Sequence, residues 1–114
     1  EWRLSGPGEI IAERRDRPDG GRLLPAPAGY LLYDSLALDG RGRVCVATII
    51  QGGISIIDPV AGTTDHLPLP DLLTTNICFG GPDLGTAYAT LSSTGKLVSF
   101  PWPEAGLPLN FLNK

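Results

Sequence analysis

Methionine is absent from the 114 residues, histidine occurs once and cysteine only twice. The two cysteines, Cys45 and Cys78, match no zinc-binding spacing, and a single pair is no disulfide framework, so a zinc-finger or disulfide-stapled domain is excluded. Each lies in an apolar run, where a free thiol behaves as a small hydrophobe. We therefore expect both to be buried and reduced, with a metal pair or a disulfide as the alternatives.

Long hydrophobic runs are also missing. No apolar stretch approaches the roughly 20 residues of a membrane helix, and the opening residues do not read as a signal peptide. We therefore expect no membrane partner and a cytoplasmic location. The missing initiator methionine and the abrupt, strand-like start at residues 1–4 lead us to expect a piece of a longer protein.

The chain lacks an excess of basic charge. Nine basic and twelve acidic side chains give a net charge of −3, whereas neutralising phosphates needs a basic face, so nucleic acid is excluded as a partner.

The 42% apolar residues suffice for one modest domain with a core. What the chain has in excess is glycine (15) and proline (11), spaced between apolar runs as in an all-β fold of short strands and turns.

Residues 33–48 contain the clearest predicted hairpin. Leu36 and Leu38 alternate with small side chains, residues 39–42 (Asp-Gly-Arg-Gly) form a tight turn, and Val44 and Val46 continue the alternation. Short strands are also expected at residues 1–4, 9–12 and 54–57, with a polar connection at residues 13–21.

An internal repeat organises the second half of the chain. Residues 34–40 align with residues 75–81 at an offset of 41, residues 44–48 with 86–90 at 42, and the Leu-Pro-Leu-Pro exit at 67–70 with Leu-Pro-Leu-Asn at 107–110 at an offset of 40. A period of 40–45 residues with three or four strands is typical of a β-propeller blade. A small β-sandwich built from the same strands is the alternative.

The predicted blades are residues 34–72 and 74–110, with residues 1–33 providing outer strands of a preceding blade and a polar connection. All belong to one structural unit of two to two and a half blades. The first strand of a blade lines the central channel, which makes Asp34 and Thr75 the axial residues, with Ser35 and Asn76 beside them. Without further information, Asp34 is read as a turn or cap residue, and Thr75 and Asn76 equally well as residues that hydrogen-bond the blade entrance.

Three stretches carry a family likeness: residues 33–42 (YDSLALDGRG), residues 44–48 (VCVAT) and residues 75–84 (TNICFGGPDL). They resemble the C-terminal part of the senescence marker protein / gluconolactonase / luciferin-regenerating enzyme family. The resemblance implies part of a six-bladed β-propeller with one divalent cation, calcium or zinc, and a small-molecule lactone as substrate. It implies that Asp34 is a metal ligand and the general base, with Ser35 in place of the family's usual glycine.

The family's other ligands have no counterpart in this sequence, and a catalytic divalent site needs about three protein ligands. We therefore expect the chain to be a fragment of a lactonase-type hydrolase that is inactive by itself. The alternative is a non-catalytic partial propeller, or a β module that self-associates through exposed blade edges into a homo-oligomer.

We predict structural roles, and no catalytic or metal-binding ones, for the other candidate residues. Asp39 lacks the spaced oxygen ligands of a calcium loop and is predicted to be a hairpin-turn residue. His66, the only histidine, has no nucleophile motif near it and is predicted to lie on a surface or strand edge. The aromatic residues expected to pack between blades are Trp2, Phe79, Phe100 and Trp102.

Overall fold

The computed structural model describes residues 1–11 and 21–110, and every regular element in these ranges is a β-strand. The prediction of an all-β chain is confirmed. No helix in the described ranges is long and apolar enough to cross a membrane. The strands are β1 (Arg3–Gly6), β2 (Glu9–Ile11), β3 (Leu32–Leu38), β4 (Val44–Ile49), β5 (Ile54–Asp58), β6 (Thr63–Leu67), β7 (Thr74–Gly80), β8 (Thr86–Leu91) and β9 (Lys96–Pro101).

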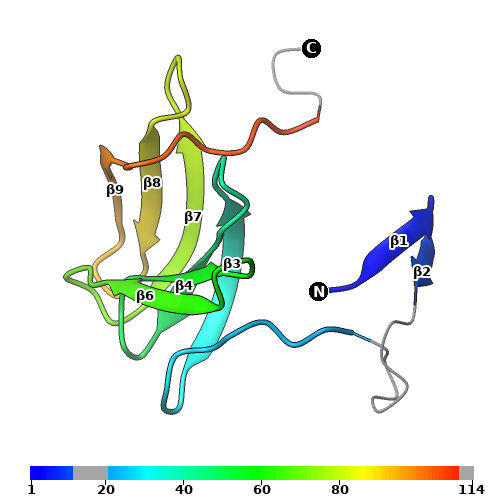
Figure 1. Ribbon diagram of the computed structural model, residues 1–114. Helices are drawn as coiled ribbons and strands as arrows, with labels where there is room; N and C mark the ends of the chain where they lie inside the picture. The colour runs from blue at the N-terminus through cyan, green and yellow to red at the C-terminus, as the bar shows by residue number, and fades with distance from the viewer. Residues whose placement is uncertain (12–20, 111–114) are drawn as a thin grey trace.

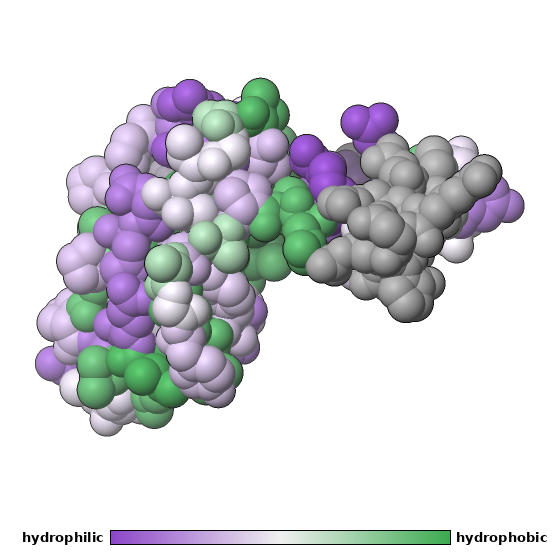
Figure 2. Space-filling model, turned by 60° about the horizontal axis from the view of Figure 1, so that its bottom comes forward, coloured by the Kyte–Doolittle hydropathy of each residue, from purple (hydrophilic) through white to green (hydrophobic). Residues whose placement is uncertain are grey.

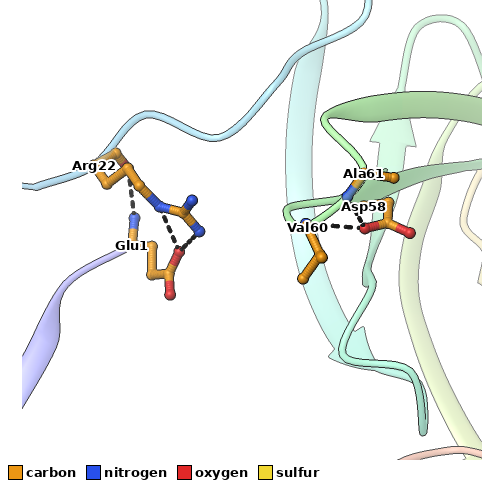
Figure 3. Close-up of polar contacts among 5 residues, drawn as sticks. All are labelled: Glu1, Arg22, Asp58, Val60 and Ala61. Carbon is orange, nitrogen blue, oxygen red and sulfur yellow. Dashed lines mark hydrogen bonds and ion pairs between the residues drawn. The ribbon is translucent and has the colours of Figure 1, made fainter.

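The first large sheet has the antiparallel order β3-β4-β5-β6. Its two central strands, β4 and β5, are the most deeply buried. Their β-branched and small side chains pack well on a pleated surface that is covered on both faces. At the end of β5 the Asp58 carboxylate accepts hydrogen bonds from the backbone N–H groups of Val60 (2.9 Å) and Ala61 (2.8 Å), which fixes the turn to β6 (Figure 3). The hydrogen bond from Ala61 is the main reason that the pKa of Asp58 is lowered.

The second sheet, β7-β8-β9, repeats the first one at a constant offset. Its strands begin 42 residues after their counterparts: Thr74 after Leu32, Thr86 after Val44, and Lys96 after Ile54. The pairing repeats too, because Leu36↔Val46 in the first sheet becomes Cys78↔Tyr88 in the second. We call β3 and β7 the innermost strands, because they are the strands predicted to line the channel. The offset between them is therefore 42 and not 41, which makes Asn76, rather than Thr75, the counterpart of Asp34.

The two sheets lie side by side, with β3 and β4 against β7 (Figure 1). Small side chains let the sheets approach: Cys45, Ala47 and Ala87 are fully buried, and Trp102 fills the remaining space at 6% exposure. The rings of Phe79 and Phe100 lie 5.5 and 6.1 Å from the Trp102 ring. The predicted packing role of these three aromatic residues is confirmed.

The N-terminal hairpin of β1 and β2 lies apart from the two large sheets (Figure 1), and the space-filling view shows the N-terminal part projecting from the body of the molecule (Figure 2). Its first residue is fastened to the following segment: the Glu1 ammonium donates to the carbonyl of Arg22 (3.0 Å), and the Arg22 guanidinium pairs with the Glu1 carboxylate (Figure 3). Trp2 is half-exposed and lies against Gly21, so its predicted place between blades is wrong. The polar connection predicted at residues 13–21 falls, except for Gly21, outside the described residues.

Residues 105–109, the C-terminal crossing segment, depart from the repeat. At an offset of 42 they correspond to β6, the fourth strand of the first sheet. Instead they run across the ends of β7 and β3 (Figure 1), where Gly106 N–H donates to Leu84 O (2.9 Å) and Leu107 N–H to Leu38 O (2.9 Å). Only glycine fits at 106, because a Cβ there would lie 2.3 Å from the Cβ of Phe79. Among the described residues, β9 thus has no fourth strand beside it, and the predicted likeness between the exits of the two blades is wrong.

Candidate functional site

Asp34 lies on the innermost strand of the first sheet, at a β-bulge. Tyr33 pairs with Thr48, and the next pair is Leu36 with Val46. Asp34 and Ser35 of β3 therefore lie opposite a single residue of β4, Ala47. Asp34 is exposed and Ser35 half-buried. Within residues 1–11 and 21–110 the Asp34 carboxylate makes no hydrogen bond or ion pair. Bulges re-aim side chains beside active sites, and this one presents a carboxylate that is not used to hold the fold together.

The second sheet has a bulge at nearly the same place, between Thr74 and Asn76 on β7. The Thr75 hydroxyl is bonded to two neighbouring hydroxyls, those of Thr90 (2.9 Å) and Ser92 (2.7 Å). Asn76 is exposed, as Asp34 is. Of the two predicted channel-lining residues on β7, Thr75 is thus engaged within its own sheet, and the side-chain amide of Asn76 has no hydrogen-bond partner in the part of the chain that the structure describes.

The described residues contain no group of three or more histidine, cysteine, aspartate or glutamate side chains able to hold a metal ion. A catalytic divalent cation ordinarily takes about three protein ligands, and Asp34 alone does not make such a set. The part of the chain that the structure describes therefore does not fit a complete metal centre.

Asp39 is a structural carboxylate, as predicted. Its side chain is fully buried. One oxygen accepts the backbone N–H groups of Arg41 (3.1 Å) and Arg43 (3.0 Å), and the other binds Nε and Nη2 of the Arg43 guanidinium, both at 2.7 Å. Charge-assisted bonds of this kind stabilise a buried charge. All its lone pairs are used in the β3–β4 turn, which leaves none for a cation.

Asp71 is a second structural carboxylate, which the sequence reasoning missed. Its oxygens accept hydrogen bonds from the N–H groups of Leu73 (2.8 Å), Ser93 (3.3 Å) and Thr94 (2.9 Å) and from the Thr94 hydroxyl (2.8 Å). Desolvation favours the neutral acid, but these hydrogen bonds outweigh it and hold the pKa of Asp71 well below its usual range. Asp71 thereby ties the segment between the sheets to the β8–β9 turn. The available signal was the Ser-Ser-Thr-Gly turn at 92–95, whose N–H groups and hydroxyls require acceptors.

His66 lies on β6 beside a cavity of about 320 Å³ that Arg43 and Trp102 also line. Within the described residues neither ring nitrogen of His66 has a hydrogen-bond partner. Among the described strands β6 is the last in the order of its sheet, so the predicted strand-edge position of His66 is confirmed.

The two cysteines are both free, which removes the disulfide alternative. Cys45 is buried on β4, and burial, with a smaller contribution from Asp39, raises the pKa of its thiol to about 12. Cys78 is exposed on β7, so the prediction that both are buried is wrong. The alternation of β7 explains this: Ile77 and Phe79 face the core, whereas Asn76 and Cys78 face away from it.

Comparison with known proteins gives a consistent result. The family model described as the SMP-30/gluconolactonase/LRE-like region matches residues 7–93. Regucalcin from Xenopus laevis is 36% identical over 63 residues, and regucalcin from Pongo abelii 35% over 63 residues; each match covers 54% of this chain and 21% of the relative. The matched segment thus spans about one fifth of the length of these relatives. The sheet arrangement agrees with the predicted partial β-propeller, and the chain belongs to the SMP-30/gluconolactonase/LRE-like family.

Proposed function

We propose that the complete protein containing this chain is a metal-dependent hydrolase of lactones, either sugar lactones or related esters, and that Asp34 belongs to its active site. The observation that carries this proposal is the carboxylate of Asp34, exposed at a bulge of an innermost strand with no structural partner in the described chain. The family membership, and the name gluconolactonase within the family description, support the substrate class.

Asp34 acts in this proposal as a general base. Its carboxylate accepts a proton from a water molecule whose oxygen attacks the lactone carbonyl carbon. The ring C–O bond then breaks, the proton passes to the departing ring oxygen, and the product is the open hydroxy acid. A divalent cation, calcium or zinc, supplies positive charge to the carbonyl oxygen when it is bound, and in the proposal Asp34 is one of its ligands.

The 114-residue chain is expected to be inactive by itself. Its described residues offer one ligand where about three are needed. Adding calcium or zinc to the isolated chain should therefore produce no acid release from a lactone, in contrast to the complete protein.

The test is acid release by the complete protein, measured with a pH indicator, with and without a chelator. Asp34→Asn should lower turnover by about 10²–10⁴-fold, because a positioned general base contributes that much. Asp65→Asn is the matched control, because Asp65 is an exposed aspartate on β6, three strands away from β3. Full turnover in Asp34→Asn would refute the proposal.

A second candidate function is that of a self-associating β module without catalysis. It is favoured by the open edge of β9, beside which the described residues place no strand, and by Leu97 on that strand, whose side chain is 68% exposed. It predicts a dimer or trimer of the isolated chain in sedimentation equilibrium. A monomer with one stoichiometric bound cation would contradict it.

A further inference from the structure

A cavity of about 290 Å³ lies between the innermost strands of the two sheets, beneath the C-terminal crossing segment. Four leucines from two separate parts of the chain line it: Leu36 and Leu38 on β3, and Leu107 and Leu109 from the crossing segment. All four are more than a third exposed. Since water's share of liquid volume is about 30 Å³, the cavity has room for roughly ten groups of that size.

The remaining lining is uncharged. It consists of Ala37 on β3 and of residues 76–79 on β7, which are Asn76, Ile77, Cys78 and Phe79. No charged side chain lines the cavity. A polyhydroxylated ligand needs several hydrogen-bonding groups around it, because a hydroxyl buried without a partner loses free energy, and here a single amide is available for this purpose.

The cavity lies close to the proposed active site, although Asp34 is not part of its lining. Leu36 follows Asp34 by two residues on the same strand, which is roughly 7 Å of extended chain. Asn76, at the equivalent place on the neighbouring strand, is itself part of the lining. A molecule with its reacting carbonyl at Asp34 would therefore extend its substituent toward the leucines.

Resting on the function proposed above, we infer that the lactone is an apolar one: an alkyl-substituted lactone whose hydrocarbon chain occupies this cavity, with one hydrogen-bonding group at Asn76. The alkyl chain would pack against the four exposed leucines. Each of its methylene groups removed from water contributes about 0.8 kcal/mol, a factor of about four in affinity. A sugar lactone, with a hydroxyl on most carbons, would gain nothing from them.

The kinetic test uses the complete protein with δ-lactones that carry alkyl chains from methyl to hexyl, beside D-glucono-δ-lactone. We expect kcat/KM to rise up to about fourfold per added methylene until the cavity is full. Leu36→Asn should flatten this rise. Leu97→Asn should preserve it, because Leu97 is at least as exposed as Leu36 but lies on β9 outside the cavity. Efficient Asp34-dependent hydrolysis of the gluconolactone without any rise along the alkyl series would overturn the inference and leave the proposed function standing.

The binding test needs no turnover. Cys78 is an exposed cysteine in the cavity lining, and Cys45 is buried with a pKa raised to about 12, so of the two cysteines in this chain iodoacetamide at neutral pH modifies Cys78. Saturating hexyl-substituted lactone should slow the alkylation of Cys78 in the complete protein at least severalfold, and the gluconolactone should not. Protection without hydrolysis of any lactone would support the ligand class and refute the proposed function. An unprotected Cys78, or one that cannot be alkylated at all, would overturn the inference.

Discussion

The aspartates Asp34 and Asp71 have the same side chain in opposite circumstances. Asp34 is exposed on an innermost strand with no partner among the described residues, whereas Asp71 is 94% removed from solvent and accepts four hydrogen bonds. The first contributes little to folding and is free to bind a ligand; the second can bind nothing but stabilises the junction of the two sheets. The number of donors around a carboxylate, rather than its place in the sequence, separates the two roles.

Asp39 extends the comparison, because it lies only five residues from Asp34 on the same hairpin. Both of its oxygens are used by the turn and by Arg43. Substitutions at these positions should therefore act on different properties of the protein, activity for Asp34 and stability for the other two.

The largest expected effect on stability is that of Asp39→Ala. The substitution leaves the Arg43 guanidinium, whose side chain is 19% exposed, without its anion, and breaking a buried ion pair costs about 3–5 kcal/mol. Urea denaturation should report the loss. Arg41→Ala is the control, since its contact with Glu104 is long (3.7 Å) and exposed, and it should change stability by less than about 0.5 kcal/mol. Equal effects would mean that the Asp39–Arg43 pair is not what holds this turn.

The comparison between Asp71 and Asp34 can be tested directly with Asp71→Asn and Asp34→Asn. Asparagine at 71 keeps the shape of the side chain but turns one acceptor into a donor that faces the Thr94 N–H. The urea midpoint of Asp71→Asn should fall clearly, whereas that of Asp34→Asn should stay within the range of ordinary surface substitutions, about 0.5 kcal/mol. A reversed order of the two midpoints would contradict the structural assignment.

Acid should weaken the junction through Asp71. Its pKa is lower in the folded chain than the ordinary value of 3.8, so the unfolded state takes up the proton first as the pH falls. The stabilisation is complete above about pH 5 and declines progressively below it. The urea midpoint should therefore drop between pH 6 and pH 3 in the unsubstituted chain, and drop less in Asp71→Asn. The difference between the two chains isolates Asp71 from the other carboxylates.

The smallest expected effects separate Thr75 from Asn76. Thr75→Val removes two hydroxyl contacts on β7 and should cost about 1 kcal/mol of stability without changing turnover of the complete protein. Asn76→Ala should do the opposite, leaving the urea midpoint unchanged while raising KM for an alkyl lactone. If Thr75→Val impairs turnover and Asn76→Ala does not, the counterpart of Asp34 is Thr75 after all.

Much of the fold could be predicted from sequence because it depends on local patterns. The β-branched run at 54–57, the Asp-Gly-Arg-Gly turn at 39–42 and the repeat of about 42 residues each have a direct structural cause. Asp34 could be singled out on the same grounds, together with the family resemblance. Its roles as ligand and base stay predictions.

What could not be predicted depends on contacts between distant residues. Thr74 and Thr75 have the same side chain, and only the strand register shows that Thr75 lies at the bulge. Residues 107–110 resemble residues 67–70 in sequence, but Gly106 lies against Phe79 and the chain there does not take the fourth-strand position. Cys78 was expected inside because its neighbours are apolar, yet it lies on the face of β7 that points away from the core.

The C-terminal crossing segment also has a consequence for folding kinetics. Its hydrogen bond joins Leu107 to Leu38, residues 69 positions apart in the sequence, and Gly106 lies against the side chain of Phe79, 27 positions earlier. We expect contacts of such long range to form late in folding, because closing a long loop costs chain entropy before the contact stabilises the fold. The cavity between the innermost strands is therefore completed in one of the last steps of folding.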